Sequence, residues 1–281
     1  AACVLFEYLI QKFLVRGAST IGNWSAVVTG VLLAFNLPAS IPWWIVLIGA
    51  FVAIVVAKQL FGGLGCNFAN PAITGRVFLL LSFAGDMTTW VKPFYYHGLS
   101  IGNQLSSSAG SLDLDAVTSA TPLVTGTESL SNLFLGNVGG CIGETSALAL
   151  LLGGLFLIFT RVISPSTPIA YLGSLGILTF FHALATGGSL TEVPYALLSG
   201  GVMIGAFFMA TDYVTTPITT KGKWIFGIGC GILTFVIREF ASMPEGCSFS
   251  ILLMNLLTPY IDKFTMTKPL GAKPIKQKEE A

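Results

Sequence analysis

Most of this chain consists of apolar stretches long enough to cross a lipid bilayer. A membrane-spanning helix needs about 17 to 25 mainly apolar residues, because every backbone amide must find its partner within the segment. Only 10% of the residues are charged and 53% are hydrophobic, which leaves too little polar surface for a soluble globule. The sequence therefore predicts an all-α polytopic membrane protein. About nine candidate spans lie at residues 1–15, 22–37, 42–62, 68–86, 134–160, 168–184, 193–210, 223–239 and 246–263.

The ends of the chain differ in character. Ala1 and Ala2 begin within an apolar stretch, without an initiator methionine or the charged flank of a cleavable signal. We therefore expect one further helix to precede this sequence, which makes ten in all. Residues 1–263 should form a single transmembrane domain, and residues 264–281 should form a basic tail.

The basic residues indicate how the spans are oriented. They fall on one side of the membrane if the nine spans alternate, and cytoplasmic loops are the ones enriched in lysine and arginine. That side, with the C-terminus, should be cytoplasmic, and residues 87–133 should be extracytoplasmic. The net charge of +1 and an ordinary basic flank predict no nucleic-acid partner. The residues concerned are Lys12, Arg16, Arg161, Lys221, Lys223 and the lysines from Lys263 onward.

Two parts of the chain resemble each other. GVLLAFNLP at 30–38, an apolar segment and GCNFA at 65–69 are matched by GAFFMATDYVTTP at 205–217, another apolar segment and GCSFS at 246–250. About five spans separate the two units, and an odd number inverts the second copy in the membrane. With the missing helix restored, this pattern predicts a five-plus-five inverted repeat, the first at about 1–86 and the second at about 134–263.

Broken helices are typical of such repeats. They expose backbone dipoles at membrane depth, where the two repeats meet. The alternative is that the prolines in this chain only mark loop ends at the membrane surface. The candidate breaks are Asn36 before Pro38, Asn70 before Pro71, Asp212 before Pro217 and Asn255 before Pro259.

The predicted external segment contains a run that resembles a covalent flavin-attachment sequence, D-x-x-[ST]-G-A-[ST]. In such a sequence the last threonine forms a phosphoester with flavin mononucleotide (FMN), so we expect FMN on Thr121. Ser119 stands where the pattern has glycine, and its Cβ can hinder the tight turn. The alternative is a chance match in a Ser/Thr-rich stretch. The matching positions in the run DAVTSAT are Asp115, Thr118, Ala120 and Thr121.

Taken together, these features resemble the RnfD family, the membrane flavin subunits of Rnf ferredoxin:NAD oxidoreductase complexes. A weaker resemblance extends to the B subunit of the sodium-translocating NADH:quinone reductase. The resemblance implies a ten-helix electron-transfer subunit that couples electron flow to Na⁺ or H⁺ transport in the inner or plasma membrane of a prokaryote. It also implies covalent FMN, a second, riboflavin-like flavin between the helices, and other Rnf subunits as partners, including a second one with covalent FMN. Besides the attachment-like run, the resemblance rests on FNLP at 35–38, NFANPA at 67–72, GCIGETS at 140–146, ATDYVTT at 210–216 and residues 245–262.

Asparagines are candidates for the non-covalent flavin site. The pyrimidine edge of an isoalloxazine ring needs both donors and acceptors once water is excluded, and an amide side chain supplies both. Asn67 and Asn70 are three residues apart, which places them on one face or in one turn, with Asn36 behind them. The alternative is that they only cap helix ends.

Ionisable residues within the spans are candidates for an ion pathway, because each costs roughly 2.5 to 3.5 kcal/mol at a helix centre. Glu144 lies in a glycine-rich segment and Asp212 in a threonine-rich one. Their alternative roles are an interhelical hydrogen bond and a helix N-cap. Lys58 should reach the interface by snorkelling, and Arg238 with Glu239 should lie at the outer interface.

Motifs for soluble substrates or metals are not found. The sequence has no G-x-G-x-x-G run and no P-loop, and its five cysteines have no C-x-x-C spacing. We therefore expect no catalytic residue and no metal site in this chain alone. Two rival functions remain: a channel or solute transporter, for which inverted repeats are typical, and a scaffold subunit without flavin.

Overall fold

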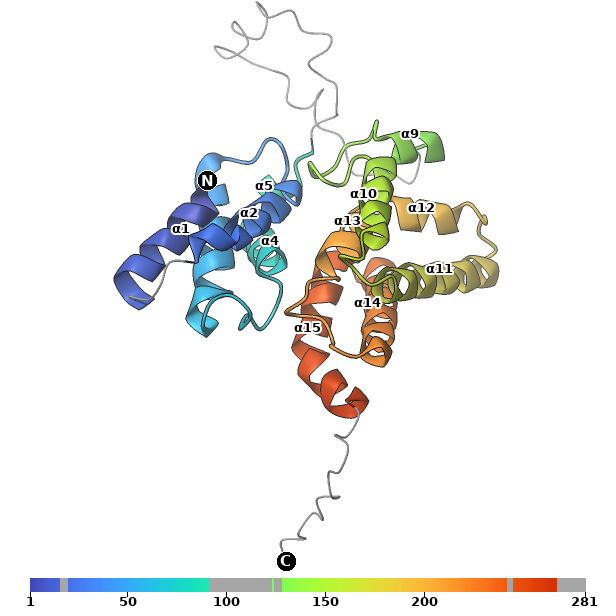
Figure 1. Cartoon of the computed structure of the whole chain (residues 1–281). Coiled ribbons are helices and arrows are strands. Elements are labelled where there is room, and N and C mark those ends of the chain that lie inside the picture. The colour runs from blue at the N-terminus through green and yellow to red at the C-terminus, as the bar shows by residue number, and fades with distance from the viewer. Residues whose placement is uncertain (16–19, 91–122, 124–127, 242–244, 267–281) are drawn as a thin grey trace, which may run out of the picture.

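The predicted all-α class is confirmed. The computed structural model describes residues 1–15, 20–90, 123, 128–241 and 245–266, and every regular element in these ranges is a helix. The helices form two groups that lie side by side, α1 to α5 and α9 to α15 (Figure 1). The second group is the larger, and its last helix, α15, extends toward the C-terminal end of the molecule.

Several helices are long and apolar enough to span a bilayer. In the part of the chain that the structure describes, these are Trp43–Phe61, α11 (Ser166–Thr186) and α14 (Thr220–Phe240). A fourth candidate is bent by 64° between α12 (Glu192–Leu198) and Val202–Met209. The composite spans are built from α3 (Trp43–Phe51), the π-helical turn η3 (Val52–Val56), η4 (Gln59–Phe61), α13 (Val202–Ile204) and the π-helical turn η6 (Gly205–Met209).

Three apolar helices are too short to cross a membrane alone. α2 (Ser25–Phe35), α4 (Pro71–Ser82) and α10 (Ala147–Phe159) have 11, 12 and 13 residues. At about 1.5 Å per residue they reach roughly 17–20 Å, against a hydrocarbon core of about 30 Å. Each therefore covers only part of the thickness, as broken helices do.

Two predicted boundaries were wrong. The span expected from residue 134 begins only at α10, because α9 (Leu130–Leu135) ends at Gly136, whose φ of 103° suits glycine alone, and turns follow. The break expected between Asn255 and Pro259 is absent, since α15 (Gly246–Thr265) continues through the proline. One proline removes a single N–H donor, and α15 packs along α14, so the helix can continue through Pro259.

Within the first group, α1 and α4 both pack against α3. α1 continues into a π-helical turn and contacts both α2 and α3. Gly75 of α4 lies so close to α3 that a Cβ there would be 2.9 Å from the carbonyl oxygen of Gly49. The bounds are α1 (Ala2–Ile10), η1 (Gln11–Val15), η2 (Ile21–Asn23) and α5 (Ala84–Met87).

The helices of the second group also pack closely. Gly227 and Gly231 lie one turn apart on α14, against α11. A Cβ on Gly231 would come within 2.8 Å of the carbonyl oxygen of Tyr171. Small residues at such a spacing let two membrane helices approach until their backbones touch.

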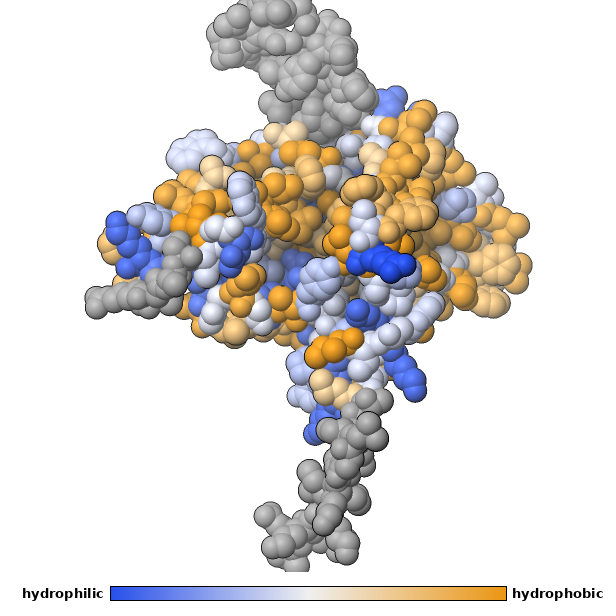
Figure 2. Space-filling model, in the orientation of Figure 1, coloured by the Kyte–Doolittle hydropathy of each residue, from blue (hydrophilic) through white to orange (hydrophobic). Residues whose placement is uncertain are grey.

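The surface matches a lipid environment. Hydrophobic residues cover much of the body in the view of Figure 2, and hydrophilic residues are seen mainly on its lower central part and in smaller patches elsewhere. Large apolar side chains such as Phe159 (83% exposed) and Leu184 (66%) point outward. The chain is therefore a polytopic membrane protein. α9 and the end of α15 lie at opposite ends of the molecule (Figure 1), as the predicted topology requires, while the domain bounds and the cytoplasmic face stay predictions.

Candidate functional site

Helix ends from both groups meet inside the protein. α2 ends at Phe35 with Asn36 as its C-cap, α4 begins after Asn70, and η6 ends at Met209. Asn36 and Asn70 are only 1% and 3% exposed, so these helix ends are buried inside the protein, as the broken-helix interpretation expects. We call this meeting place the seam.

Asn70 serves both groups at once. Its Oδ1 accepts hydrogen bonds from the backbone N–H groups of Ala72 (3.0 Å) and Ile73 (3.3 Å), which caps α4. Its Nδ2 donates to the carbonyl of Met209 at 3.2 Å. The Asn255 amide, oriented to match its neighbours, accepts from the Asn70 N–H at 3.0 Å. The capping role is thus real, and the same residue also links α4 to η6 and α15.

A cavity of about 380 Å³ opens beside the seam. Its wall is mainly apolar, with Leu32, Phe207 and Phe208 among the lining residues. The polar lining includes Asn67, Asn70, Asp212 and Lys58. Asn67 and Asn70, predicted to contact a flavin, and Asp212, predicted to lie on an ion pathway, therefore line one cavity. We call it the seam cavity. Asn36 lies behind its wall, where its Nδ2 donates to the Leu32 carbonyl at 2.6 Å and contacts the Met209 sulfur at 3.5 Å.

Asp212 and Asn67 bring polar atoms to the seam cavity from turns. Asp212 follows η6, and its Oδ2 accepts from the Thr215 hydroxyl at 3.0 Å. Burial raises the pKa of the Asp212 carboxyl above its ordinary value, although the Thr215 hydroxyl bond opposes this. Among the described residues, Asn67 Nδ2 donates only to the nearby Ala69 carbonyl, at 3.3 Å.

Lys58 does not reach the membrane surface, so the snorkelling prediction was wrong. Its Nζ forms an ion pair with Glu7 at 2.8 Å and donates to the Ser25 hydroxyl at 2.7 Å. The side chain is 3% exposed and lines the seam cavity. Desolvation of an ammonium is severe, and a buried partner 51 positions away in the sequence offsets it better than a stretched side chain. No local spacing could have revealed this pair.

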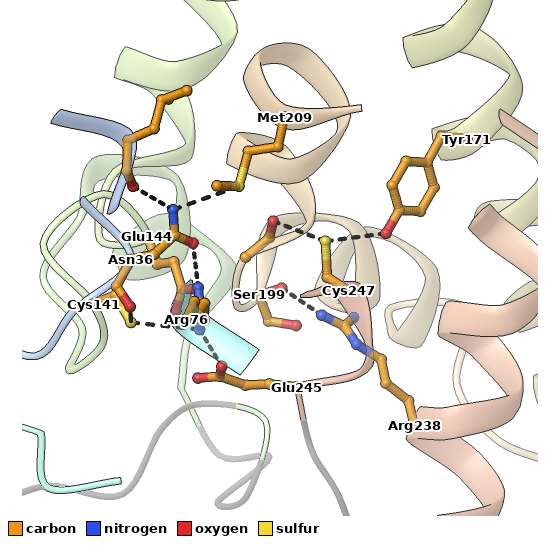
Figure 3. Close-up of polar contacts among 12 residues, drawn as sticks. Asn36, Arg76, Cys141, Glu144, Tyr171, Ser199, Met209, Arg238, Glu245 and Cys247 are labelled. Atoms are coloured by element: carbon orange, nitrogen blue, oxygen red, sulfur yellow. Dashed lines mark hydrogen bonds and ion pairs between the residues drawn. The ribbon is translucent and has the colours of Figure 1, made fainter. Parts of the chain in front are cut away.

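A second polar centre surrounds Arg76, which the sequence analysis did not single out. Arg76 lies on α4, and its Nη1 donates to Asn36 Oδ1 and to Glu144 Oε1, the latter at 2.9 Å. Its Nη2 donates to Glu245 Oε2 and contacts the Cys141 sulfur at 3.5 Å. Figure 3 shows these five side chains converging, and we call them the arginine cluster. An arginine within an apolar segment was the available signal.

The arginine cluster joins the two groups of helices. Asn36 and Arg76 come from the first group, while Cys141, Glu144 and Glu245 come from the second. Glu144 therefore makes the interhelical contact expected as its alternative role. One ligand atom each of Cys141, Glu144 and Glu245 lies within 4.8 Å of the others, a spacing that suits a cation.

A third polar group joins α11, α14 and α15. The Tyr171 hydroxyl lies 2.7 Å from the Thr234 oxygen, 3.1 Å from the Cys247 sulfur and 3.3 Å from the Ser250 oxygen. Thr234 and Ser250 are also 2.7 Å apart. We call these four residues the hydroxyl cluster.

Arg238 has structural contacts in the described part of the chain. Its guanidinium donates to the carbonyls of Ala196 (2.7 Å) and Ser199 (3.0 Å), and so fixes the bend after α12. Glu239 is exposed and lies 3.8 Å from His182.

The predicted attachment residues lie outside the described residues: Asp115, Thr118, Ser119, Ala120 and Thr121.

Comparison with known proteins decides the family. The model of the NQR2, RnfD, RnfE family matches residues 1–271, nearly the whole chain. The chain belongs to this family. Among its relatives, the D subunit of the Na⁺-translocating ferredoxin:NAD⁺ oxidoreductase complex of Acetobacterium woodii is 47% identical, with 100% of this chain and 84% of the relative aligned.

Other relatives carry similar descriptions. The D subunit of the proton-translocating ferredoxin:NAD⁺ oxidoreductase complex of Clostridium ljungdahlii is 43% identical over 97% of this chain and 82% of its own length. The D subunit of an ion-translocating oxidoreductase complex of Stutzerimonas stutzeri is 40% identical over 96% of this chain and 82% of its own. The expected resemblance to RnfD proteins is thus confirmed. The relatives are subunits of redox enzymes that move ions across a membrane.

Proposed function

We propose that this chain is an electron-transfer subunit of an ion-translocating ferredoxin:NAD⁺ oxidoreductase. In this proposal, FMN is bound covalently to Thr121 and a second, riboflavin-like flavin occupies the seam cavity without a covalent bond. The observation that carries the proposal is the family match over residues 1–271 of a chain that also contains the run DAVTSAT. Other subunits of the complex, one of them with its own covalent FMN, are the partners and bind the soluble substrates.

The seam cavity has the size and chemistry that a flavin ring requires. Its volume of about 380 Å³ lies within the usual range for small-molecule sites, roughly 300–1,000 Å³. Apolar side chains line most of it, as suits a flat aromatic ring, and the Asn67 and Asn70 amides offer a polar edge. Asn70 Nδ2 already bonds Met209, so Asn67 is the more available donor. When bound, the flavin supplies the ability to accept and release electrons.

Two features of the cavity wall bear on ion coupling. Lys58 and Glu7 form an internally balanced pair, whereas Asp212 has no basic partner among the described residues. Burial raises the pKa of Asp212, which therefore can hold a proton when negative charge develops nearby. We assign Asp212 and Glu144 to the pathway of the coupled cation. Related subunits are described with either Na⁺ or protons, so this family likeness favours neither ion.

A denaturing gel viewed under ultraviolet light tests the proposal. Protein from a host that contains the flavin transferase should give a fluorescent band that survives denaturation. Thr121→Ala should abolish this band, and Thr125→Ala, outside the run DAVTSAT, is the matched control that should retain it. An unlabelled wild-type band would contradict covalent FMN and would favour the transporter or scaffold alternatives.

A further inference from the structure

The arginine cluster contains more negative than positive groups. One guanidinium, that of Arg76, faces the carboxylates of Glu144 and Glu245. The side chains of Arg76 and Glu144 are each 2% exposed and that of Glu245 is 10% exposed, so water screens this charge poorly. An uncompensated charge in a low-dielectric interior is costly, and proteins normally pair it or bind a counter-ion.

One carboxylate oxygen of this cluster has no hydrogen-bond partner among the residues that the structure describes. Glu245 Oε2 binds Arg76, while Oε1 is buried and has no hydrogen-bond donor among the described residues. A buried carboxylate oxygen without a donor loses its hydration without replacement. A carboxylate oxygen of Glu144, the Cys141 sulfur and a carboxylate oxygen of Glu245 lie within 4.8 Å of one another, close enough to share a ligand.

The other charged and titratable groups around Glu245 do not satisfy this oxygen. Arg238 of α14 places a second positive charge near Glu245, but its guanidinium donates to the carbonyls of Ala196 and Ser199 and forms no ion pair with a described carboxylate. Cys247, on the first turn of α15, contacts the Gly201 carbonyl at 3.3 Å and lies near the Tyr171 hydroxyl. The amino end of α15 offsets only about half an elementary charge at Glu245.

We propose that Glu245, together with Glu144, binds one exchangeable monovalent cation, either a proton or Na⁺, beside Arg76. A proton on Oε1 makes Glu245 neutral and leaves Arg76 paired with Glu144. A Na⁺ ion takes oxygen ligands from both carboxylates. In either case the cluster reaches one positive charge for each negative charge.

The site is connected to the seam cavity. Arg76 donates to Asn36, the Asn36 amide contacts the Met209 sulfur, and the Met209 carbonyl accepts from Asn70, which lines the cavity. The arginine cluster and the seam cavity are therefore both linked to Met209, the last residue of η6. The inference deepens the proposed coupling by adding Glu245 to its pathway, and it rests on the proposed function only for the use of the cation.

Cation binding can be measured without electron transfer. The full-length protein is purified in detergent, and its thermal midpoint is followed by tryptophan fluorescence at several pH values. Na⁺ is exchanged for choline at constant ionic strength. Glu245→Gln keeps the shape of the side chain and removes the charge. Glu192→Gln, at an exposed acid on α12, is the matched control.

If the cation is Na⁺, a concentration ten times its dissociation constant should raise the wild-type midpoint by about 3–5 °C. Glu245→Gln should lose this rise, and Glu192→Gln should keep it. If the cation is a proton, Na⁺ should have no specific effect. The wild-type midpoint should then fall as pH rises relative to that of Glu245→Gln, because only the wild type loses a bound stabilising proton.

The inference is overturned if the thermal midpoints of the wild type and Glu245→Gln respond identically to both Na⁺ and pH. Glu144→Gln provides a second test if Glu245→Gln does not fold, since it removes the other carboxylate of the same site. These thermal midpoints do not depend on Thr121. If they show no cation binding, the flavin proposal still stands, and if the ultraviolet gel shows no covalent flavin, the thermal measurement is still valid.

Discussion

The hydroxyl cluster and the arginine cluster are both buried polar groups, but they are built differently. In the hydroxyl cluster, neutral groups from α11, α14 and α15 satisfy one another at 2.7–3.3 Å. In the arginine cluster, charged groups from both halves meet, and Arg76 Nε and Glu245 Oε1 lack partners among the described residues. The first arrangement is sufficient to hold helices together.

The difference indicates which of the two has a role beyond packing. A neutral hydrogen bond costs little to bury, whereas ionisable groups at membrane depth are expensive and are typically retained where ions move. The arginine cluster also lies at the seam, next to the flavin-sized cavity, while the hydroxyl cluster lies within the second group of helices. Substitutions should therefore affect stability, cofactor content and coupling to different extents in the two regions.

The largest effect is expected from Arg76→Met. It leaves two buried carboxylates without their cation, which should lower the free energy of unfolding by about 3–5 kcal/mol. Thermal unfolding in detergent and the yield of monodisperse protein measure this. The triple variant with Glu144→Gln and Glu245→Gln removes the stranded charges and should recover much of the loss. An Arg76→Met protein as stable as the wild type would mean that the cluster carries no ionic charge.

The seam cavity should respond next. Asn70→Ala removes the α4 cap, at a cost of about 0.5–2 kcal/mol, together with a predicted flavin contact. Asn67→Ala removes a predicted flavin contact but no helix cap. It should therefore deplete extractable riboflavin with little loss of stability. Flavin extraction and chromatography quantify the non-covalent cofactor, and the tethered FMN provides an internal control. Retention of the full amount in the Asn67→Ala, Asn70→Ala double variant would reject the cavity as the second flavin site.

Tyr171→Phe should have a smaller effect, about 0.5–1.5 kcal/mol of stability, because it removes one hydroxyl while Thr234 and Ser250 keep their mutual bond. Both flavins should remain. Chemical or thermal denaturation, with flavin content as the second readout, separates this packing role from a functional one. A loss of flavin or of ion coupling would erase the distinction between the two clusters.

Asp212→Asn should change stability less than the variants above, yet it should reduce the number of ions moved per electron in the assembled complex. Burial raises the pKa of Asp212 in the folded protein above its unfolded value. Its contribution to stability is therefore full below the unfolded pKa and is lost as pH rises through the folded pKa. The wild-type midpoint should decline with rising pH relative to that of the Asn variant. Full coupling in the Asn variant would remove Asp212 from the pathway.

Much of the fold could be predicted from single segments. Length and apolarity located helices such as α11 and α14, because those properties are local. The combination of Asn67, Asn70 and Asp212 in one cavity could be anticipated because each residue precedes or follows a helix break. The early start assigned to α10 failed because glycine-rich turns have the same mean apolarity as a helix.

The ion pairs could not be predicted in this way. Arg76 and Glu245 are 169 positions apart, and Glu7 and Lys58 are 51 apart, so their pairing depends on how whole helices pack. Treating Lys58 as an isolated cation led to the wrong expectation of snorkelling. A buried charge at membrane depth indicates that a partner exists, but the identity of the partner is a property of the tertiary structure.

Intact-mass analysis of the full-length chain, expressed together with its flavin transferase, tests the proposed redox function most directly. We predict a wild-type mass larger than that of the polypeptide by one phosphoester-linked FMN, and a Thr121→Ala mass equal to that of the polypeptide alone. Wild-type protein with the mass of the bare polypeptide would contradict the account.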